Sequence, residues 1–201
     1  FPSSNLKNEI ASEYQTFRYN PYIEGNLSTQ EDGLLGLLDE YNSYCHTMAT
    51  TWDLKEAYMK AAPVDVKGYT RWMGSLITWV QAYYEFRYFI LEYLRFARFS
   101  NYDVYGQIKD EPDLITVFNH ITQQYKNLID QYEKEVTFTA QNYWQQKGYK
   151  AYLNEKRKFF FIGKDGWATG FQVEMNDKDK LLPLLQSDRY DEIIKELNIV
   201  P

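Results

Sequence analysis

The fold of this chain is decided by residues 69–99, which read YTRWMGSLITWVQAYYEFRYFILEYLRFARF. Aromatic side chains recur in this stretch at a seven-residue step, and a second apolar row runs beside them at the same step. The rows are Trp72, Trp79, Phe86 and Tyr93, and Tyr69, Leu76, Tyr83, Ile90 and Ala97. Seven residues are about two turns of an α-helix, so both rows lie on one helix. Because this helix is apolar over most of its circumference, we expect it to lie centrally in a bundle.

A second long helix is predicted over 114–143, where apolar residues alternate steps of three and four. This spacing is typical of a helix that packs lengthwise against antiparallel neighbours. Two further helices are predicted nearer the N-terminus, over 5–18 and, after a Ser28–Glu31 capping box, to about Ala62. A polar link is expected over 101–109. The sequence therefore predicts a mainly α fold, an elongated antiparallel helical bundle of about four helices.

The period of the pattern changes after Lys158 from helical to alternating, with Thr169, Phe171, Val173 and Met175 at every second position. An Asp-Gly pair at 165–166 is typical of a two-residue turn, so we expect a β-hairpin there. Pairing across this turn sets Ile162 opposite Thr169 and Phe160 opposite Phe171. Two short helices follow. We therefore divide the chain into a helical bundle (1–157) and a β-hairpin with two short helices packed on the bundle (158–201).

Composition excludes several partners. The 201 residues carry a net charge of -6, and the run at 156–158 is the one basic cluster, so we expect no nucleic-acid partner. The most apolar stretch, 75–91, is interrupted by Gln81, Glu85 and Arg87, so we expect a soluble chain without a membrane span. The single Cys45 excludes a thiolate metal cage and is expected to be a buried, inert thiol.

The sequence offers no recognisable catalytic motif. His46 and His120 each share a helical side with polar residues, which indicates surface positions. Neither is preceded at three residues by the glutamate that a di-iron bundle needs. Glu92 lies three residues before Arg95, and we interpret the two as a surface salt bridge. We therefore predict no catalytic residue, no metal site, no cofactor and no enzymatic activity.

The remaining signal is an excess of aromatic residues, 18% of the chain with 19 tyrosines. Exposed aromatic side chains are enriched at protein interfaces and in ligand clefts. The first hypothesis is a non-enzymatic interaction protein, an accessory or structural subunit that presents Tyr-rich helix ends and the hairpin, with Trp167 at its tip and Phe171 as binding residues, to a larger protein partner. The alternative is an extracytoplasmic small-ligand binding protein with an aromatic cleft of Trp72, Trp79 and Tyr83, in which Arg87 fixes an anionic group. Arg87 in a structural ion pair is the other interpretation of that residue.

Two sequence features bear on the compartment, which stays open. The chain begins at Phe1 rather than at Met, so it is either a processed, exported or organellar mature chain or a trimmed form. An Asn26-Leu27-Ser28 sequon would be used only in a eukaryotic secretory pathway.

Overall fold

The computed structural model describes residues 1–25, 27–174 and 176–201, so Asn26 of the sequon and Met175 of the predicted alternation lie outside the described residues. The described chain is mainly α-helical with one antiparallel sheet, which confirms the predicted fold class. The α-helices are α1 (Leu34–Asp53), α2 (Lys55–Ala61), α3 (Val66–Ser100), α4 (Tyr102–Asp110), α5 (Pro112–Lys134), α6 (Ala140–Gln146), α7 (Asn176–Leu185) and α8 (Asp191–Leu197). The strands are β1 (Lys150–Asn154), β2 (Phe159–Lys164) and β3 (Trp167–Gln172).

Contacts along the chain group into two units built from interleaved segments. The first unit comprises Phe1–Cys45, Ala82–Tyr125 and Asn176–Pro201, and the second comprises His46–Gln81 and Lys126–Met175. The boundaries fall inside α1, α3 and α5, so each of these helices contributes one part to each unit. The division into 1–157 and 158–201 stays a prediction.

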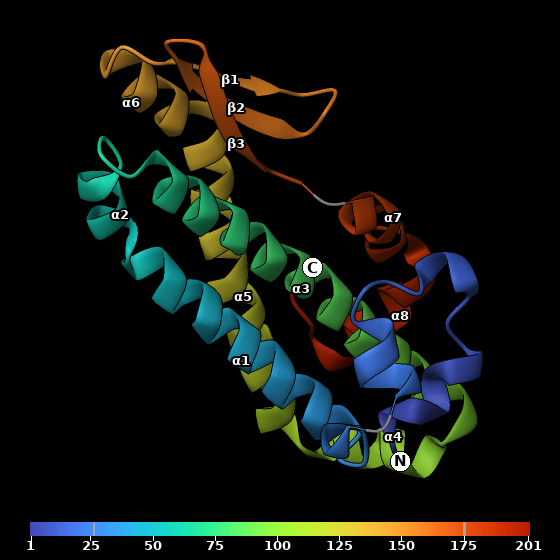
Figure 1. Cartoon of the computed structure of the whole chain (residues 1–201). Helices are drawn as coiled ribbons and strands as arrows, with labels where there is room; N and C mark the ends of the chain where they lie inside the picture. Colours follow the sequence, from blue (N-terminus) through green and yellow to red (C-terminus); the bar gives the residue numbers. More distant parts are fainter. Residues whose placement is uncertain (26, 175) are drawn as a thin grey trace. The chain divides into compact units, whose positions relative to one another are not determined.

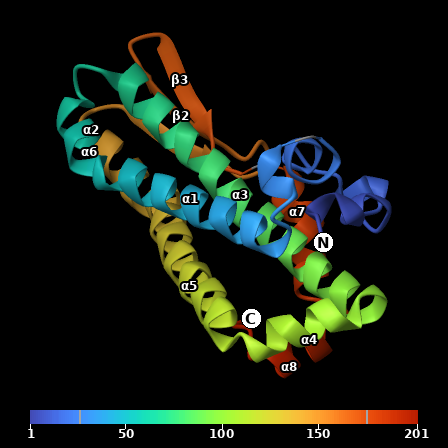
Figure 2. The ribbon, with the colours of Figure 1, turned by 90° about the horizontal axis from the view of Figure 1, so that it is seen from below.

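The first unit is built around the second half of α3, whose side chains are almost all buried between Ala82 and Leu94. Short 3₁₀ turns at Ser3–Asn8 and Ser12–Tyr14 replace the helix predicted over 5–18, so that prediction was wrong. A tertiary contact offers the reason, because the Arg18 backbone N–H donates to Glu85 Oε1 at 2.9 Å instead of continuing a helix. Helix α7 lies beside these N-terminal turns in both ribbon views (Figures 1 and 2).

The second unit contains the sheet, whose strand order is β1-β2-β3 and which follows α6 directly (Figure 1). The predicted pairs Ile162 with Thr169 and Phe160 with Phe171 are confirmed. The predicted turn is confirmed as well, since Asp165 and Gly166 both have positive φ, 49° and 85°, as a type I′ turn requires. The sheet nevertheless has three strands rather than two, because β1 pairs antiparallel with β2.

Three helix assignments differ from the sequence prediction. The expected link at 101–109 is mostly α4, and the expected single helix before Ala62 divides into α1 and α2 at Leu54. The helix predicted over 114–143 is interrupted by π-helical turns at Glu135–Thr139. Threonines and a valine in this segment lower its α-helix propensity, which accounts for a change of helix type at this point.

Candidate functional site

The two faces of the sheet differ in burial. Side chains alternate along a strand, so Phe160, Ile162 and Phe171 share one face, and this face is buried. The Phe171 ring centre lies 6.3 Å from that of Tyr69 on α3, so the chain's own helix covers it. Phe171 is 4% exposed and packs on Phe160 at 5.3 Å, which makes it a core residue in this structure rather than a free binding residue.

The opposite face of the sheet, which we call the outer face, carries aromatic side chains that remain accessible. Tyr152 of β1 is 41% exposed, and its ring stacks on Phe161 of β2 with centroids 5.3 Å apart and planes 18° apart. Phe159 is the next outer residue of β2, and its ring lies against Gly170 of β3, where a Cβ would clash with it. Cross-strand pairs of this kind stabilise a sheet and leave a flat apolar surface.

A hollow of about 350 Å³ lies at the end of this sheet where β2 turns into β3. Its lining includes Lys150, Tyr152, Phe161, Lys164, Asp165 and Trp167. Trp167 is 43% exposed, and the ring contact that it makes is an edge contact with Tyr149, with centroids 6.0 Å apart. The hollow is therefore open, and aromatic, charged and small residues from the three strands and the β2–β3 turn line it.

Positive charge surrounds this hollow. Lys150 Nζ lies 6.0 Å from the centre of the Tyr152 ring, and Lys164 Nζ lies 5.0 Å from that of Tyr149. Within the described residues, neither ammonium group forms an ion pair with a carboxylate. Residues 147–174 contain six Lys or Arg and three Asp or Glu, although the whole chain has a net charge of -6. This part of an acidic chain is therefore locally basic.

The predicted cleft residues of the second unit, Trp72 and Trp79, lie on α3. Trp72 is buried, stacks on Tyr58 with ring centroids 5.3 Å apart, and donates its Nε1–H to the Thr51 carbonyl at 2.7 Å. Trp79 is half-buried. Trp72 is therefore packed as a core side chain.

The other two predicted cleft residues, Tyr83 and Arg87, belong to the first unit and are both buried. The Tyr83 ring contacts Tyr41 and Tyr125, with centroids 6.1 and 5.4 Å away. One guanidinium nitrogen of Arg87 donates to the Val200 carbonyl at 2.6 Å, so the contact found for it is structural. The predicted cleft draws on residues of both units and stays a prediction.

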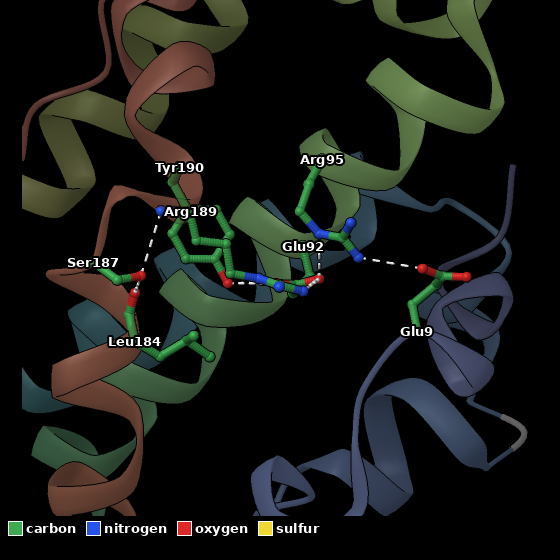
Figure 3. Close-up of polar contacts among 7 residues, drawn as sticks. All are labelled: Glu9, Glu92, Arg95, Leu184, Ser187, Arg189 and Tyr190. Atoms are coloured by element: carbon green, nitrogen blue, oxygen red, sulfur yellow. Dashed lines mark hydrogen bonds and ion pairs between the residues drawn. The ribbon is translucent and has the colours of Figure 1, made fainter.

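Glu92 contradicts the interpretation of a surface salt bridge, because its side chain is 0% exposed. Figure 3 shows it as the centre of a network in the first unit. Arg189 Nε donates to Glu92 at 2.7 Å and Arg95 Nε at 2.9 Å, and the Tyr190 hydroxyl donates to the same carboxylate. Arg95 also reaches Glu9 at 3.2 Å. The network joins α3 to the N-terminal turns and to the 3₁₀ turn that precedes α8.

The electrostatics of this network follow from its geometry. Burial alone would raise the pKa of Glu92, but the hydrogen bonds from Arg189, Tyr190 and Arg95 outweigh it and lower that pKa. Burial and the neighbouring Glu92 carboxylate both raise the pKa of Tyr190. Glu92 therefore stays ionised and Tyr190 stays neutral at neutral pH, and both are satisfied within the protein.

A second buried carboxylate of α3 is paired in the same way. Arg18 and Glu85 are almost completely buried, with Arg18 NH1 2.5 Å from Glu85 Oε2. Burial alone would lower the pKa of Arg18, but Glu85 and Tyr44 outweigh it and raise that pKa. Arginines from distant segments, Arg18 for Glu85 and Arg189 for Glu92, make the burial of both glutamates possible.

The predictions for the two histidines and the cysteine are confirmed. His46 and His120 are exposed, and Cys45 is a buried free thiol whose pKa is raised to about 11 by burial.

In the described ranges, no group of three or more His, Cys, Asp or Glu side chains is placed to hold a metal ion. No helix among the described residues combines the length and the apolar character needed to cross a membrane.

Comparison with known proteins adds no assignment, since no family model, curated protein or solved structure matches this chain. The candidate site must therefore be judged by its geometry. Of the predicted binding residues, Trp167 lies at the hollow, whereas Phe171 faces the core. Sequence reasoning missed Lys150 and Phe161. The signal that could have found them is the alternation of side chains along β1, the strand that pairs with β2, because it places every second residue on the outer face.

Proposed function

We propose that this chain is a non-enzymatic interaction protein, an accessory or structural subunit that binds a protein partner through the outer face and the end hollow of its sheet. The observation that carries the proposal is the difference between the two faces. The chain's own helix covers the inner face at Phe171, whereas Tyr152 on the outer face is 41% exposed. Trp167 lies on the same side of β3 as Phe171, but at the end of the strand it is 43% exposed and lines the hollow. Exposed Tyr and Trp side chains around a concave apolar site are typical of interface hot spots.

Two further features support the proposal. Most residues that line the hollow lie on paired strands and the others form the tight β2–β3 turn, so the site is held in place before a partner arrives. β1 and β3 are the end strands of the sheet, and an end strand can accept a further strand from a partner.

Site-specific photo-crosslinking tests the proposal. A photoreactive phenylalanine analogue is placed at Tyr152, and in a second protein at Tyr102, a control tyrosine that is 75% exposed on α4. In an extract of the source organism, we expect position 152 to give one discrete adduct and position 102 to give none. The adduct should decrease at least about fivefold with Trp167→Ala, as for loss of an interface anchor.

The crosslinked protein is then identified by mass spectrometry and purified, and its Kd is measured with wild type and Trp167→Ala. An adduct that Trp167→Ala leaves unchanged, or equal crosslinking from both positions, would contradict the proposal.

A further inference from the structure

We infer that the partner segment at this site is an extended, acidic stretch of polypeptide that places one large apolar side chain in the hollow. The inference rests on the proposed function and specifies its partner. It is carried by three properties of the described residues: the sign of the local charge, the shape of the hollow and the edge of the sheet beside it.

The first property is charge. Lys150 lies on the outer face next to the Tyr152 ring, and Lys164 lies at the same end of the sheet. Neither has a carboxylate partner among the described residues, in contrast to Lys55, Lys158 and Lys180. Charges farther than about 8–10 Å are largely screened at physiological salt. A partner at the hollow therefore meets this basic end of the sheet rather than the net negative charge of the chain, and carboxylates complement it.

The second property is shape. The hollow, at about 350 Å³, can hold one large side chain, and its Tyr152, Phe161 and Trp167 lining suits an apolar or aromatic group. A single-stranded nucleic acid fits less well, because it needs separate rings on which successive bases stack and a groove of cations along its phosphates. Here the Tyr152 and Phe161 rings already stack on each other, and Asp165 also lines the hollow.

The third property is the end strand. β3 pairs only with β2 in the sheet, and Trp167 is its first residue. An extended segment that runs along β3 could form main-chain hydrogen bonds with it and place alternate side chains over the hollow. The recognised element is therefore a strand with acidic residues two positions before and two positions after a central apolar residue, so that all three share one face.

The inference is tested with synthetic peptides and the full-length, ¹⁵N-labelled protein. The probes are acetyl-Thr-Glu-Thr-Tyr-Thr-Glu-Thr-amide, in which both Glu side chains share the Tyr face of an extended strand, the same peptide with Gln in place of every Glu, and a ten-nucleotide oligothymidine. Backbone amide shifts of Gly163 and Ala168 report the hollow. We expect the acidic peptide to shift them saturably, with at least about fivefold higher affinity than the Gln peptide and with weakening at high salt.

Charge reversal supplies the matched control. Lys150→Glu should weaken binding of the acidic peptide at least about fivefold, because an attraction between Lys150 and the peptide becomes a repulsion. Lys156→Glu makes the same change of charge in the β1–β2 turn, at the other end of β2. This substitution should weaken binding of the acidic peptide by less than about twofold. Unchanged spectra of the free variants, apart from residues near the substitution, show that the fold is retained.

Three results would overturn the inference: no saturable shift at the hollow, equal binding of the acidic and Gln peptides, or tighter binding of the oligothymidine. Equal binding of both peptides would leave the proposed function intact and remove only the acidic specificity. The crosslinking experiment at Tyr152 uses the natural partner, so its failure is separate from a failure of these probes.

Discussion

Two groups of charged side chains, the α3 carboxylates of the first unit and the lysines at the sheet end of the second, differ in burial and in partners. In the first unit, the carboxylates of Glu85 and Glu92 are buried and meet arginines from distant parts of the chain. In the second unit, the lysines at the end of the sheet stay exposed, beside rings that are also partly exposed. Buried ion pairs fix how segments of one chain fit together, whereas exposed cations around an apolar hollow remain available to a partner.

This comparison separates structural from functional use of the same residue types. Arginine and glutamate of the first unit satisfy each other, so a substitution there should cost stability. Lysine and tryptophan at the sheet end have fewer internal contacts, so a substitution there should cost binding with little loss of stability. The predictions below test this separation from the largest expected change in the free energy of unfolding to the smallest.

Arg18→Met should cause the largest loss of stability. It removes the guanidinium from Glu85, whose side chain is 0% exposed, and leaves a buried carboxylate without its charged partner. The expected cost is about 3–5 kcal/mol in the free energy of unfolding, measured by urea denaturation at pH 7. Arg71→Met, at an exposed position of α3, is the control and should cost less than about 0.5 kcal/mol. Equal effects of the two substitutions would show that the Arg18 pair is not important for stability.

Phe171→Ala compares the two faces of the sheet. The Phe171 side chain is buried between Phe160 and Tyr69, so its removal should leave a cavity and cost about 3–4 kcal/mol. Tyr152→Ala on the outer face removes a half-exposed ring and should cost less than about 1 kcal/mol. Both values come from urea denaturation. If Tyr152→Ala cost as much as Phe171→Ala, the outer face would be part of the core and not a binding surface.

Glu92→Gln tests the network of Figure 3 and its dependence on pH. A carboxylate whose pKa is lowered in the folded state stabilises the protein above its unfolded pKa, and this stabilisation is lost as pH falls through the folded pKa. The ordinary value for glutamate is 4.5. Glu92→Gln should therefore cost about 2 kcal/mol at pH 7, and this difference from wild type should shrink as the pH falls below 4.5.

Urea denaturation of both proteins at a series of pH values from 7 down to 3 measures this difference. Glu192→Gln is the control, since Glu192 pairs with Arg98 but its side chain is 74% exposed, and it should change stability by less than about 0.5 kcal/mol. If the difference in the free energy of unfolding between wild type and Glu92→Gln stayed constant down to pH 3, proton binding at Glu92 would not contribute to the pH dependence of stability.

The regular elements could be predicted from the sequence because their signals are local. The period of residues 69–99 identified α3, and Asp165-Gly166 identified the β2–β3 turn and the register of Phe160 with Phe171. Strand β1 was missed because its five residues acquire their role only by pairing with β2. Glu92 was misplaced because Arg189 and Tyr190, far along the chain, make its burial possible. Trp167 was found at the candidate site because the residue beside a tight turn is seldom covered.

Trp167→Ala should have the smallest effect on stability and the clearest effect on association. The Trp167 side chain is 43% exposed, and the ring contact found for it is an edge contact with Tyr149. Its removal takes little apolar surface from the folded protein, so we expect a loss of less than about 1 kcal/mol in urea denaturation. In the crosslinking and peptide experiments, the same substitution should weaken binding at least about fivefold, because it removes one wall of the hollow. Trp167 and Phe171 share one side of β3, so a loss of about 3 kcal/mol or more would mean that the core around Phe171 extends to Trp167 and that the end of the sheet is not a free surface.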